Sequence, residues 1–386
     1  MKGIVEIMSK ILKYGMVGGG QGAFIGVAHR RAIGLDGKAR LVAGCFSRSY
    51  SNTLTTGEEL GLEKDRLYET YEEMARAESS RVDGIDFVVI VTPNYAHYGA
   101  CKAFLEAGIH VSCDKPLTVS LDQALDLEKL AKQRNLQFMV TYAYSGHVTS
   151  MNIKAMIASG EIGEVRTVMG EYPQGWLAFE DVSGNKQSEW RINPALAGKT
   201  NALGDIGTHI ENAVYRMTGL KIKKVLAKME KVVPNRKLDD NSVVLVEYEN
   251  GASGVYWASQ IAIGHDNGLR VRIYGSKGSI LWFQEQPEVI HMAKEDGTLI
   301  ELHRGHSTIK NYAAKYERLP AGHTEGLLEA IANLYSNYID CINAQKEGTF
   351  NVDMVEYPTV VDGVDGVRFV EACLKSSENG NIWTEF

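Results

Sequence analysis

Short apolar runs alternate with amphipathic segments along the first 145 residues. The runs at 11–17, 40–46, 86–91, 110–113 and 137–142 are apolar at most positions, which is typical of strands buried on both faces of a parallel sheet. Between them, residues 95–107 and 120–134 carry apolar side chains at helical spacing. Ser120 and Gln123 predict a capping box at the start of the second of these helices. The alternation predicts a doubly wound parallel α/β domain over residues 1–145.

The pattern changes after a predicted helix at 149–159. Longer β-rich runs follow at 164–172, 224–233, 242–248, 253–259 and 270–283, and turn residues such as Asn250-Gly251 indicate hairpins. Helical patterns return at 325–345 and 361–377. Residues 173–203 show no periodicity, and we interpret them as a long functional loop. Residues 146–386 are therefore predicted to form an α+β domain with a large, mostly antiparallel open sheet.

Composition restricts the partners that we expect. The chain is 44% hydrophobic and 23% charged, with a net charge of −7 and no block of basic residues. A nucleic-acid partner would require a basic face, so we expect none. No stretch approaches the roughly 18 apolar residues of a membrane span, and residues 1–13 form no signal-peptide core. We expect a cytoplasmic protein with no membrane partner.

The five cysteines are widely spaced and contain no CxxC pair, so they predict buried free thiols and no metal site. They are Cys45, Cys101, Cys113, Cys341 and Cys373.

A glycine-rich turn follows the first predicted strand. Gly18, Gly20 and Ala23, with Gln21 between them, fit the pattern G-x-G-x-x-A at the start of a helix. A tight turn at Gly18 and the missing side chain at Gly20 let the backbone approach a pyrophosphate, and a small residue at Ala23 lets the helix lie close to the sheet. This context predicts a Rossmann domain that binds NAD or NADP.

The end of the second predicted strand bears on the choice between the two cofactors. An acidic residue there would bind the ribose hydroxyls of NAD, but this chain has Ser47-Arg48. An arginine can bind the 2′-phosphate, which favours NADP slightly. Alternatively Arg48 stacks on the adenine, which is compatible with NAD.

Three residues are candidates for acid–base chemistry. Lys115 lies just beyond a parallel strand, before a proline that holds it extended. Asp205 and His209 are four residues apart, which places a carboxylate and an imidazole on one face of a helix. Taken singly, each has an ordinary interpretation: a surface lysine, a capping aspartate and a structural histidine. No third His or Cys accompanies them, so we expect no metal.

Together these motifs resemble the Gfo/Idh/MocA oxidoreductase family, named for glucose–fructose oxidoreductase, inositol dehydrogenase and a rhizopine-catabolism protein. The resemblance rests on the glycine turn and on three further motifs, which are Thr92-Pro93-Asn94 with His97, Asp114-Lys115-Pro116, and Asp205-Ile206-Gly207-Thr208-His209. Family members usually have Glu where this chain has Asp114. Residues 32–49 and Pro320–His323 are similar to a branch of levoglucosan-type sugar 3-dehydrogenases.

The resemblance implies a function and a set of roles. Lys115, Asp205 and His209 would form the catalytic triad of an NAD(P)-dependent dehydrogenase that acts on a sugar, glycoside or inositol. The residues Thr92, Pro93, Asn94, His97 and Asp114 would line the cofactor. Relatives often assemble through the open sheet face, which implies a homodimer or homotetramer. A redox-neutral, NAD-using glycoside-cleaving enzyme and a non-catalytic dinucleotide sensor remain alternatives on the same scaffold, and either Lys115 or His209 could be the formal base.

The long loop ahead of Asp205 suggests where substrate binds. Aromatic faces beside amides and a guanidinium suit the apolar face and polar rim of a sugar or cyclitol. The loop residues with this character are Trp176, Trp190, Arg191, Asn193 and Asn201. Weaker candidates for substrate contact are Tyr144, His147 and His323.

Overall fold

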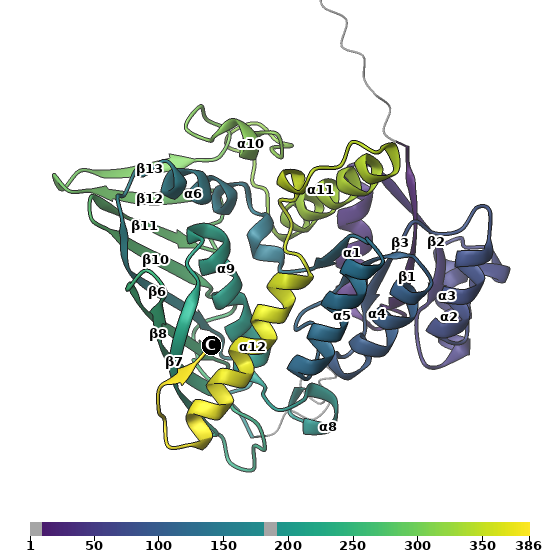
Figure 1. The fold of residues 1–386 in the computed structure, drawn as a ribbon, viewed down its shortest axis with the longest axis horizontal. Helices are drawn as coiled ribbons and strands as arrows, with labels where there is room; N and C mark the ends of the chain where they lie inside the picture. Colours follow the sequence, from purple (N-terminus) through teal and green to yellow (C-terminus); the bar gives the residue numbers. More distant parts are fainter. Residues whose placement is uncertain (1–9, 181–190) are drawn as a thin grey trace, which may run out of the picture.

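A computed structural model describes residues 10–180 and 191–386. These residues form two β-sheets, each packed against its own set of helices (Figure 1). The first sheet is parallel, with the order β2-β1-β3-β4-β5. Its strands are β1 (Leu12–Gly18), β2 (Ala39–Cys45), β3 (Phe87–Val91), β4 (His110–Cys113) and β5 (Phe138–Val140). The helices between them are α1 (Phe24–Leu35), α2 (Tyr50–Glu59), α3 (Tyr71–Ser80), α4 (His97–Glu106) and α5 (Leu121–Gln133). The predicted Rossmann domain is confirmed.

The strand order reverses between β1 and β3. Gly18, at the end of β1, pairs with Val91 at the end of β3, so the loops after these two strands open at the same edge. Since β4 pairs with β3 in parallel, the segment beginning at Asp114 leaves the sheet at this edge too. Ligands of doubly wound sheets bind at such a switch point.

A helix from the C-terminal part of the sequence covers this first sheet. Helix α11 (Leu327–Glu347) packs against α1 and β3, and the ring of Tyr338 meets Phe87 edge-on with centroids 5.5 Å apart. The hydroxyl of Tyr335 hydrogen-bonds to His29 in α1, at 2.6 Å. The sequence analysis placed this helix in the second domain because it lies beyond residue 145. The division at residue 145 stays a prediction, but the packing of the first sheet includes residues far beyond it.

The predicted capping box at α5 is wrong. Ser120 is the N-cap residue, but its side chain accepts no hydrogen bond from the helix. The N–H of Leu121 donates instead to the Glu371 carboxylate, at 3.0 Å. Glu371 belongs to α12 (Val360–Glu378), which packs on α5. A tertiary contact therefore replaces the local one.

The second sheet has nine strands in the order β13-β12-β11-β10-β6-β9-β8-β7-β14, and only β6 and β9 pair in parallel. Its strands are β6 (Val165–Pro173), β7 (Ile222–Glu230), β8 (Asn241–Tyr248), β9 (Ser253–Ser259), β10 (Arg270–Gly275), β11 (Gly278–Phe283), β12 (Val289–Lys294), β13 (Leu299–His303) and β14 (Thr384–Glu385). The predicted mostly antiparallel sheet is confirmed. The sequence analysis missed β12, β13 and β14.

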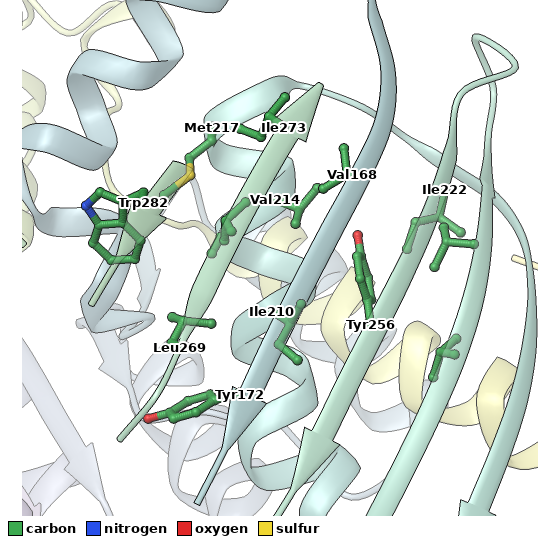
Figure 2. Close-up of a cluster of buried hydrophobic side chains, with 14 of the residues drawn as sticks. Val168, Tyr172, Ile210, Val214, Met217, Ile222, Tyr256, Leu269, Ile273 and Trp282 are labelled. Carbon is green, nitrogen blue, oxygen red and sulfur yellow. The ribbon is translucent and has the colours of Figure 1, made fainter. Parts of the chain in front are cut away.

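Helices cover one face of this sheet (Figure 1). They are α6 (Val148–Ala158), α9 (Thr208–Thr218) and α12. Figure 2 shows Ile210, Val214 and Met217 of α9 directed at the buried side chains of the strands. The remaining short elements are the helices α8 (Pro194–Ala197) and α10 (Asn311–Ala314), the π-helical turn Leu203–Gly207, and the 3-10 turns Lys64–Arg66, Asn94–Ala96, Ala143–Gly146 and Val352–Met354.

The opposite face of the sheet carries exposed apolar side chains. Met169 on β6, Val243 and Leu245 on β8, and Tyr274 on β10 are each more than a third exposed. In the described part of the chain, the helices that pack on this sheet lie on its other face. The same face carries the ion pairs of Glu171 with Arg270 and Arg272, so the open sheet face mixes exposed apolar side chains with charged ones.

Candidate active site

The glycine turn has the backbone conformation that its sequence predicts. Gly18 and Gly19 have φ angles of +84° and +73°, which side-chain-bearing residues rarely adopt. The closest approach between the turn and α1, however, is at Gly26. A Cβ atom there would lie 2.5 Å from the Cα atom of Gly19. The sequence analysis placed this close approach at Ala23, which is instead the N-cap residue of α1.

The turn also packs against α2. A Cβ atom at Gly20 would lie 2.3 Å from Oδ1 of Asn52 in α2, so this position also has no room for a side chain. The backbone N–H of Gln21 donates to Thr56 at 3.2 Å, and its side-chain amide donates to Glu59 at 2.6 Å.

The start of α1 fits a dinucleotide phosphate. The N-cap Ala23 offers no side-chain acceptor, and the first turn holds no acidic residue. The first N–H groups of a helix have no acceptor within the helix, and its dipole favours an anion at this end. The pyrophosphate of NAD could therefore bind there.

Ser47 and Arg48 follow β2 almost at once, as predicted. The side chain of Arg48 is exposed. The Ser47 hydroxyl oxygen accepts a hydrogen bond from the N–H of Ser49, at 3.1 Å. The contact of Arg48 with the cofactor stays a prediction.

His97 joins the two loops that form the edge of the site. Its ring is fully buried, with Nδ1 2.9 Å from the Pro116 carbonyl and Nε2 2.8 Å from the Thr92 carbonyl. Burial lowers its pKa, and Asp114 and the carbonyls oppose this shift. His97 therefore fixes the backbone beside Lys115 and lies too deep to line the cofactor as the sequence analysis expected. Asn94 donates to the Ala197 carbonyl at 3.2 Å and ties this edge to the second domain.

Asp205 lies at the centre of the candidate active site. Lys115 Nζ donates to its Oδ1 at 2.8 Å and to its backbone carbonyl at 2.6 Å. Its Oδ2 accepts from Arg191 Nε at 2.8 Å and from Gln260 Nε2 at 2.9 Å. Burial would raise the pKa of Asp205, but Arg191 and Lys115 outweigh burial and hold the pKa well below its ordinary value. Asp205 is thus a permanent anion.

His209 lies in an aromatic enclosure at the start of α9. Its ring centroid is 4.8 Å from that of Tyr144, 5.6 Å from that of Tyr142 and 6.0 Å from that of Tyr172. Burial first, and then the charge of Lys115, lower its pKa well below 6.5, against a smaller opposing effect of Asp205. The imidazole is therefore neutral near pH 7. Within the described residues, neither ring nitrogen forms a hydrogen bond.

The expected pairing of Asp205 with His209 is not formed by a hydrogen bond in the described part of the chain. Asp205 lies in the π-helical turn Leu203–Gly207, just before α9. Buried Asp239 holds the entry to this turn, accepting from the N–H groups of Asn201 and Leu203, both at 2.7 Å. Asn201 thus contributes through its backbone, while its buried side-chain oxygen has no partner among the described residues. The turn directs the carboxylate to the two cations.

The predicted substrate residues separate into two groups. Trp176 lies at the site: Arg191 packs over its ring at 5.5 Å, and its indole N–H donates to Gln174 at 2.8 Å. Tyr144 contacts His209, and His147 lies behind it, stacked at 6.5 Å, with burial lowering its pKa to about 4. Asn193 caps α8 and is exposed.

His323 is exposed, and its described hydrogen bonds involve its backbone: the carbonyl accepts from Arg304, and the N–H donates to the Pro320 carbonyl at 3.2 Å. None of the described contacts joins its ring to the site. Trp190 lies outside the described residues.

Four residues of the site were missed by the sequence analysis, and they are Gln174, Tyr172, Gln260 and Asn267. All four lie at the ends of strands of the second sheet or in the loops that follow. Polar side chains directly after strands were a usable signal, but only the pairing of β6 with β9 brings Gln174 close to Gln260.

A metal site and a membrane-spanning helix are both absent from residues 10–180 and 191–386. No group of three or more His, Cys, Asp or Glu side chains there could hold a metal ion. No helix in these ranges has both the length and the apolar character needed to cross a membrane.

Comparison with known proteins identifies the family. The sequence profile described as "Oxidoreductase family, NAD-binding Rossmann fold" matches residues 12–142, and "GFO/IDH/MocA C-terminal domain" matches residues 151–281. The oxidoreductase YfiI of Bacillus subtilis is 38% identical over 392 residues, covering 99% of this chain and 98% of YfiI.

Solved structures agree with this assignment. An inositol dehydrogenase homolog from Azotobacter vinelandii, complexed with NAD+, superposes with a TM-score of 0.94 at 35% identity and 98% coverage of both chains. The levoglucosan dehydrogenase of Pseudarthrobacter phenanthrenivorans is 28% identical over 54% of this chain and 58% of that enzyme. The levoglucosan-type branch stays a prediction. The resemblance in sequence is confirmed: the chain belongs to the Gfo/Idh/MocA family and is an NAD-binding oxidoreductase.

Proposed function

We propose that this protein is a dehydrogenase that oxidises a secondary hydroxyl of a sugar, glycoside or inositol, with Lys115, Asp205 and His209 as its acid–base group. The observation that carries the proposal is the contrast between the two groups beside Asp205. Lys115 is an ion-paired ammonium with three N–H groups, two of which bind Asp205. His209 is a neutral imidazole with no hydrogen-bond partner among the described residues. Lys115 can donate a hydrogen bond to a substrate oxygen, and His209 can accept the proton of the substrate hydroxyl.

The roles follow from these states. Bound nicotinamide supplies the hydride acceptor. Lys115 donates its remaining N–H to the substrate oxygen and stabilises negative charge as the hydroxyl loses its proton. His209 accepts that proton, since its lone pair is free. Asp205 binds no proton and instead holds Lys115 in place. Of the two candidate bases, the charges favour His209.

Trp176 and Arg191 suit a ring-shaped substrate. The indole N–H of Trp176 is bound to Gln174 and Arg191 packs over the ring, so the indole can offer a ligand the ring face that Arg191 leaves open. Such faces pack well on the C–H face of a sugar or cyclitol. We expect Trp176→Ala to lower kcat/KM for the best substrate, by an amount that corresponds to about 1–3 kcal/mol of transition-state binding free energy.

The test is an oxidation assay with NAD and with NADP across monosaccharides, glycosides and inositols. We expect a ring polyol to be the best substrate and reduced cofactor to accumulate in proportion to product. Faster turnover of simple 2-hydroxy acids or unbranched alcohols would contradict the polyol proposal. Product without net cofactor reduction would indicate the redox-neutral alternative, and dinucleotide binding without turnover of any compound would indicate the sensor.

Cofactor choice is tested separately. We propose that exposed Arg48 admits the 2′-phosphate of NADP besides NAD. Ser47→Asp combined with Arg48→Ala should then shift the kcat/KM ratio towards NAD, since an acid repels that phosphate and accepts from the ribose. An unchanged ratio would contradict a role for this strand end.

A further inference from the structure

Tyr144, Tyr172 and Asn267 form a closed ring of hydrogen bonds beside the site. The two phenol oxygens are 2.6 Å apart. Tyr172 donates to Oδ1 of Asn267, and Nδ2 of Asn267 donates to the Tyr144 oxygen at 3.1 Å. The three residues come from the turn before α6, from β6 and from the loop before β10. The ring therefore joins three segments that are distant in sequence.

The direction of every bond in this ring is determined by Trp176. An indole N–H can only donate, so the Gln174 atom that it meets must be the oxygen. The Gln174 amide nitrogen then donates to Oδ1 of Asn267 at 3.1 Å, which leaves Nδ2 of Asn267 for Tyr144.

The phenol protons are then fully assigned. Tyr172 gives its only hydroxyl proton to Asn267, so Tyr144 must give its own proton to Tyr172. Neither phenol retains a proton to donate to a substrate. Tyr144, a candidate for substrate contact, could therefore meet a substrate through its ring or as an acceptor, but not as a hydroxyl donor.

What the two rings do contact is His209. The centroids of Tyr144 and Tyr172 lie 4.8 Å and 6.0 Å from that of the imidazole. Both tyrosines are buried, and fixing their hydroxyls fixes their ring planes. We infer that Asn267 and Tyr172 are positioning residues, an inference that rests on the proposed role of His209. They hold the rings of Tyr144 and Tyr172, the aromatic wall, against the imidazole. Through Gln174 they also link this wall to the loop that is predicted to bind substrate.

The titration of His209 reports on this wall. The groups facing the imidazole are Lys115 from the loop after β4, Asp205 from the π-helical turn, and the phenols of Tyr142, Tyr144 and Tyr172. Burial is the main cause of the lowered pKa of His209. A loosened wall would admit water, so the pKa should rise towards the ordinary value of about 6.5.

The experiment is an NMR titration of the full chain labelled with 13C-histidine, in which the His209 signal is identified by its loss in His209→Gln. We expect Tyr172→Phe and Asn267→Leu to raise the pH at which His209 titrates, while Tyr248→Phe leaves it unchanged. Tyr248 is a matched control, because its hydroxyl pairs with that of Tyr256 at the same 2.6 Å in the same sheet.

Unchanged titration of His209 in Tyr172→Phe would overturn the inference, and so would an equal change in Tyr248→Phe. If Asn267→Leu fails to fold, Tyr172→Phe decides the matter. The titration needs no substrate, so its result does not depend on the proposed function. The proposed function is tested separately and fails if no ring polyol is oxidised. Where turnover is found, we expect kcat to fall about 10- to 100-fold with a smaller change in KM, as for a misplaced catalytic group.

Discussion

At the scale of single residues, the site is organised around a carboxylate that is saturated with donors. Asp205 accepts from Lys115, Arg191 and Gln260, and it is too acidic to take a proton from any of them. Its function is therefore to hold charge and geometry. In the proposed function, Lys115 and His209 are the groups that exchange hydrogen bonds with the reacting hydroxyl.

Replacing Lys115 tests this division of roles. Lys115→Met keeps the length of the side chain but removes the charge and the donors. We expect kcat to fall about 10²- to 10⁴-fold, as for the loss of one acid–base or oxyanion group. Dinucleotide affinity, measured by calorimetry, should stay near the wild-type value. Lys199→Met is the control, since Lys199 is 65% exposed and, among residues 10–180 and 191–386, forms an ion pair only with Glu371. A variant at Lys115 that keeps more than about a tenth of wild-type kcat would show that the role is misassigned.

At the scale of elements, the cofactor site depends on how closely α1 approaches the glycine turn. The two backbones meet at Gly19 and Gly26 with no room for a side chain. The same helix contains Gly34, which is exposed and has no neighbour within 4 Å of a built Cβ atom. One helix thus holds a glycine that packing requires and another that it does not.

The two glycines should respond oppositely to alanine. Gly26→Ala forces the backbones apart, so we expect a loss of about 1–3 kcal/mol in the free energy of unfolding, and weaker NAD binding. Gly34→Ala should raise that free energy by about 0.5–1 kcal/mol, because alanine favours the helix. Chemical denaturation and a binding titration measure both effects. Equal effects of the two substitutions would contradict the close contact.

At the scale of the whole molecule, buried neutral histidines make stability depend on pH. His110 in β4 accepts a hydrogen bond at Nδ1 from the N–H of Gln137, at 2.9 Å, and burial lowers its pKa to about 4. The unfolded chain binds the proton near pH 6.5. The free energy of unfolding therefore falls progressively as the pH decreases from 6.5 towards 4. The contribution of neutral His110 to it is fully present only above pH 6.5.

We expect His110→Asn, which keeps an acceptor but does not titrate, to reduce this pH dependence. The loss of unfolding free energy between pH 6.5 and 4.5 should be smaller by about 2–3 kcal/mol than in the wild type. His303→Asn is the control, since His303 is half exposed. An identical pH dependence in wild type and His110→Asn would show that the pKa of His110 does not differ between the folded and unfolded states.

The open sheet face predicts self-association. We propose that it binds a second copy of this chain, because exposed apolar side chains on three strands of one sheet face are typical of an interface. Leu245→Glu places a charge on β8 within it and should lower the mass measured by light scattering. Val82→Glu is the control, since Val82 is fully exposed in the first domain. A monomeric wild type, or no change of mass in Leu245→Glu, would contradict the proposal.

The elements and motifs of the fold were largely predictable, and the contacts of the site only in part. Periodicity placed all five strands of the first sheet, and the glycine, lysine and Asp205–His209 motifs indicated the three parts of the site. The sequence could not show that Asp205 faces two cations and an amide instead of His209, because Gln260 and Arg191 reach it from other segments. It also could not reveal Asn267.

The sequence by itself determined the local chemistry: which residues can turn without a side chain, donate, accept or titrate. Those properties depend on residue type and nearest neighbours, so they can be inferred from order alone. The tertiary structure decided the charge states and the partners. The neutral His209, the anionic Asp205 and the ring of Tyr144, Tyr172 and Asn267 all result from burial and from groups far apart in the chain. Burial and long-range contact exist only once the two sheets and their helices have packed, because desolvation and Coulomb interactions act through space and not along the sequence.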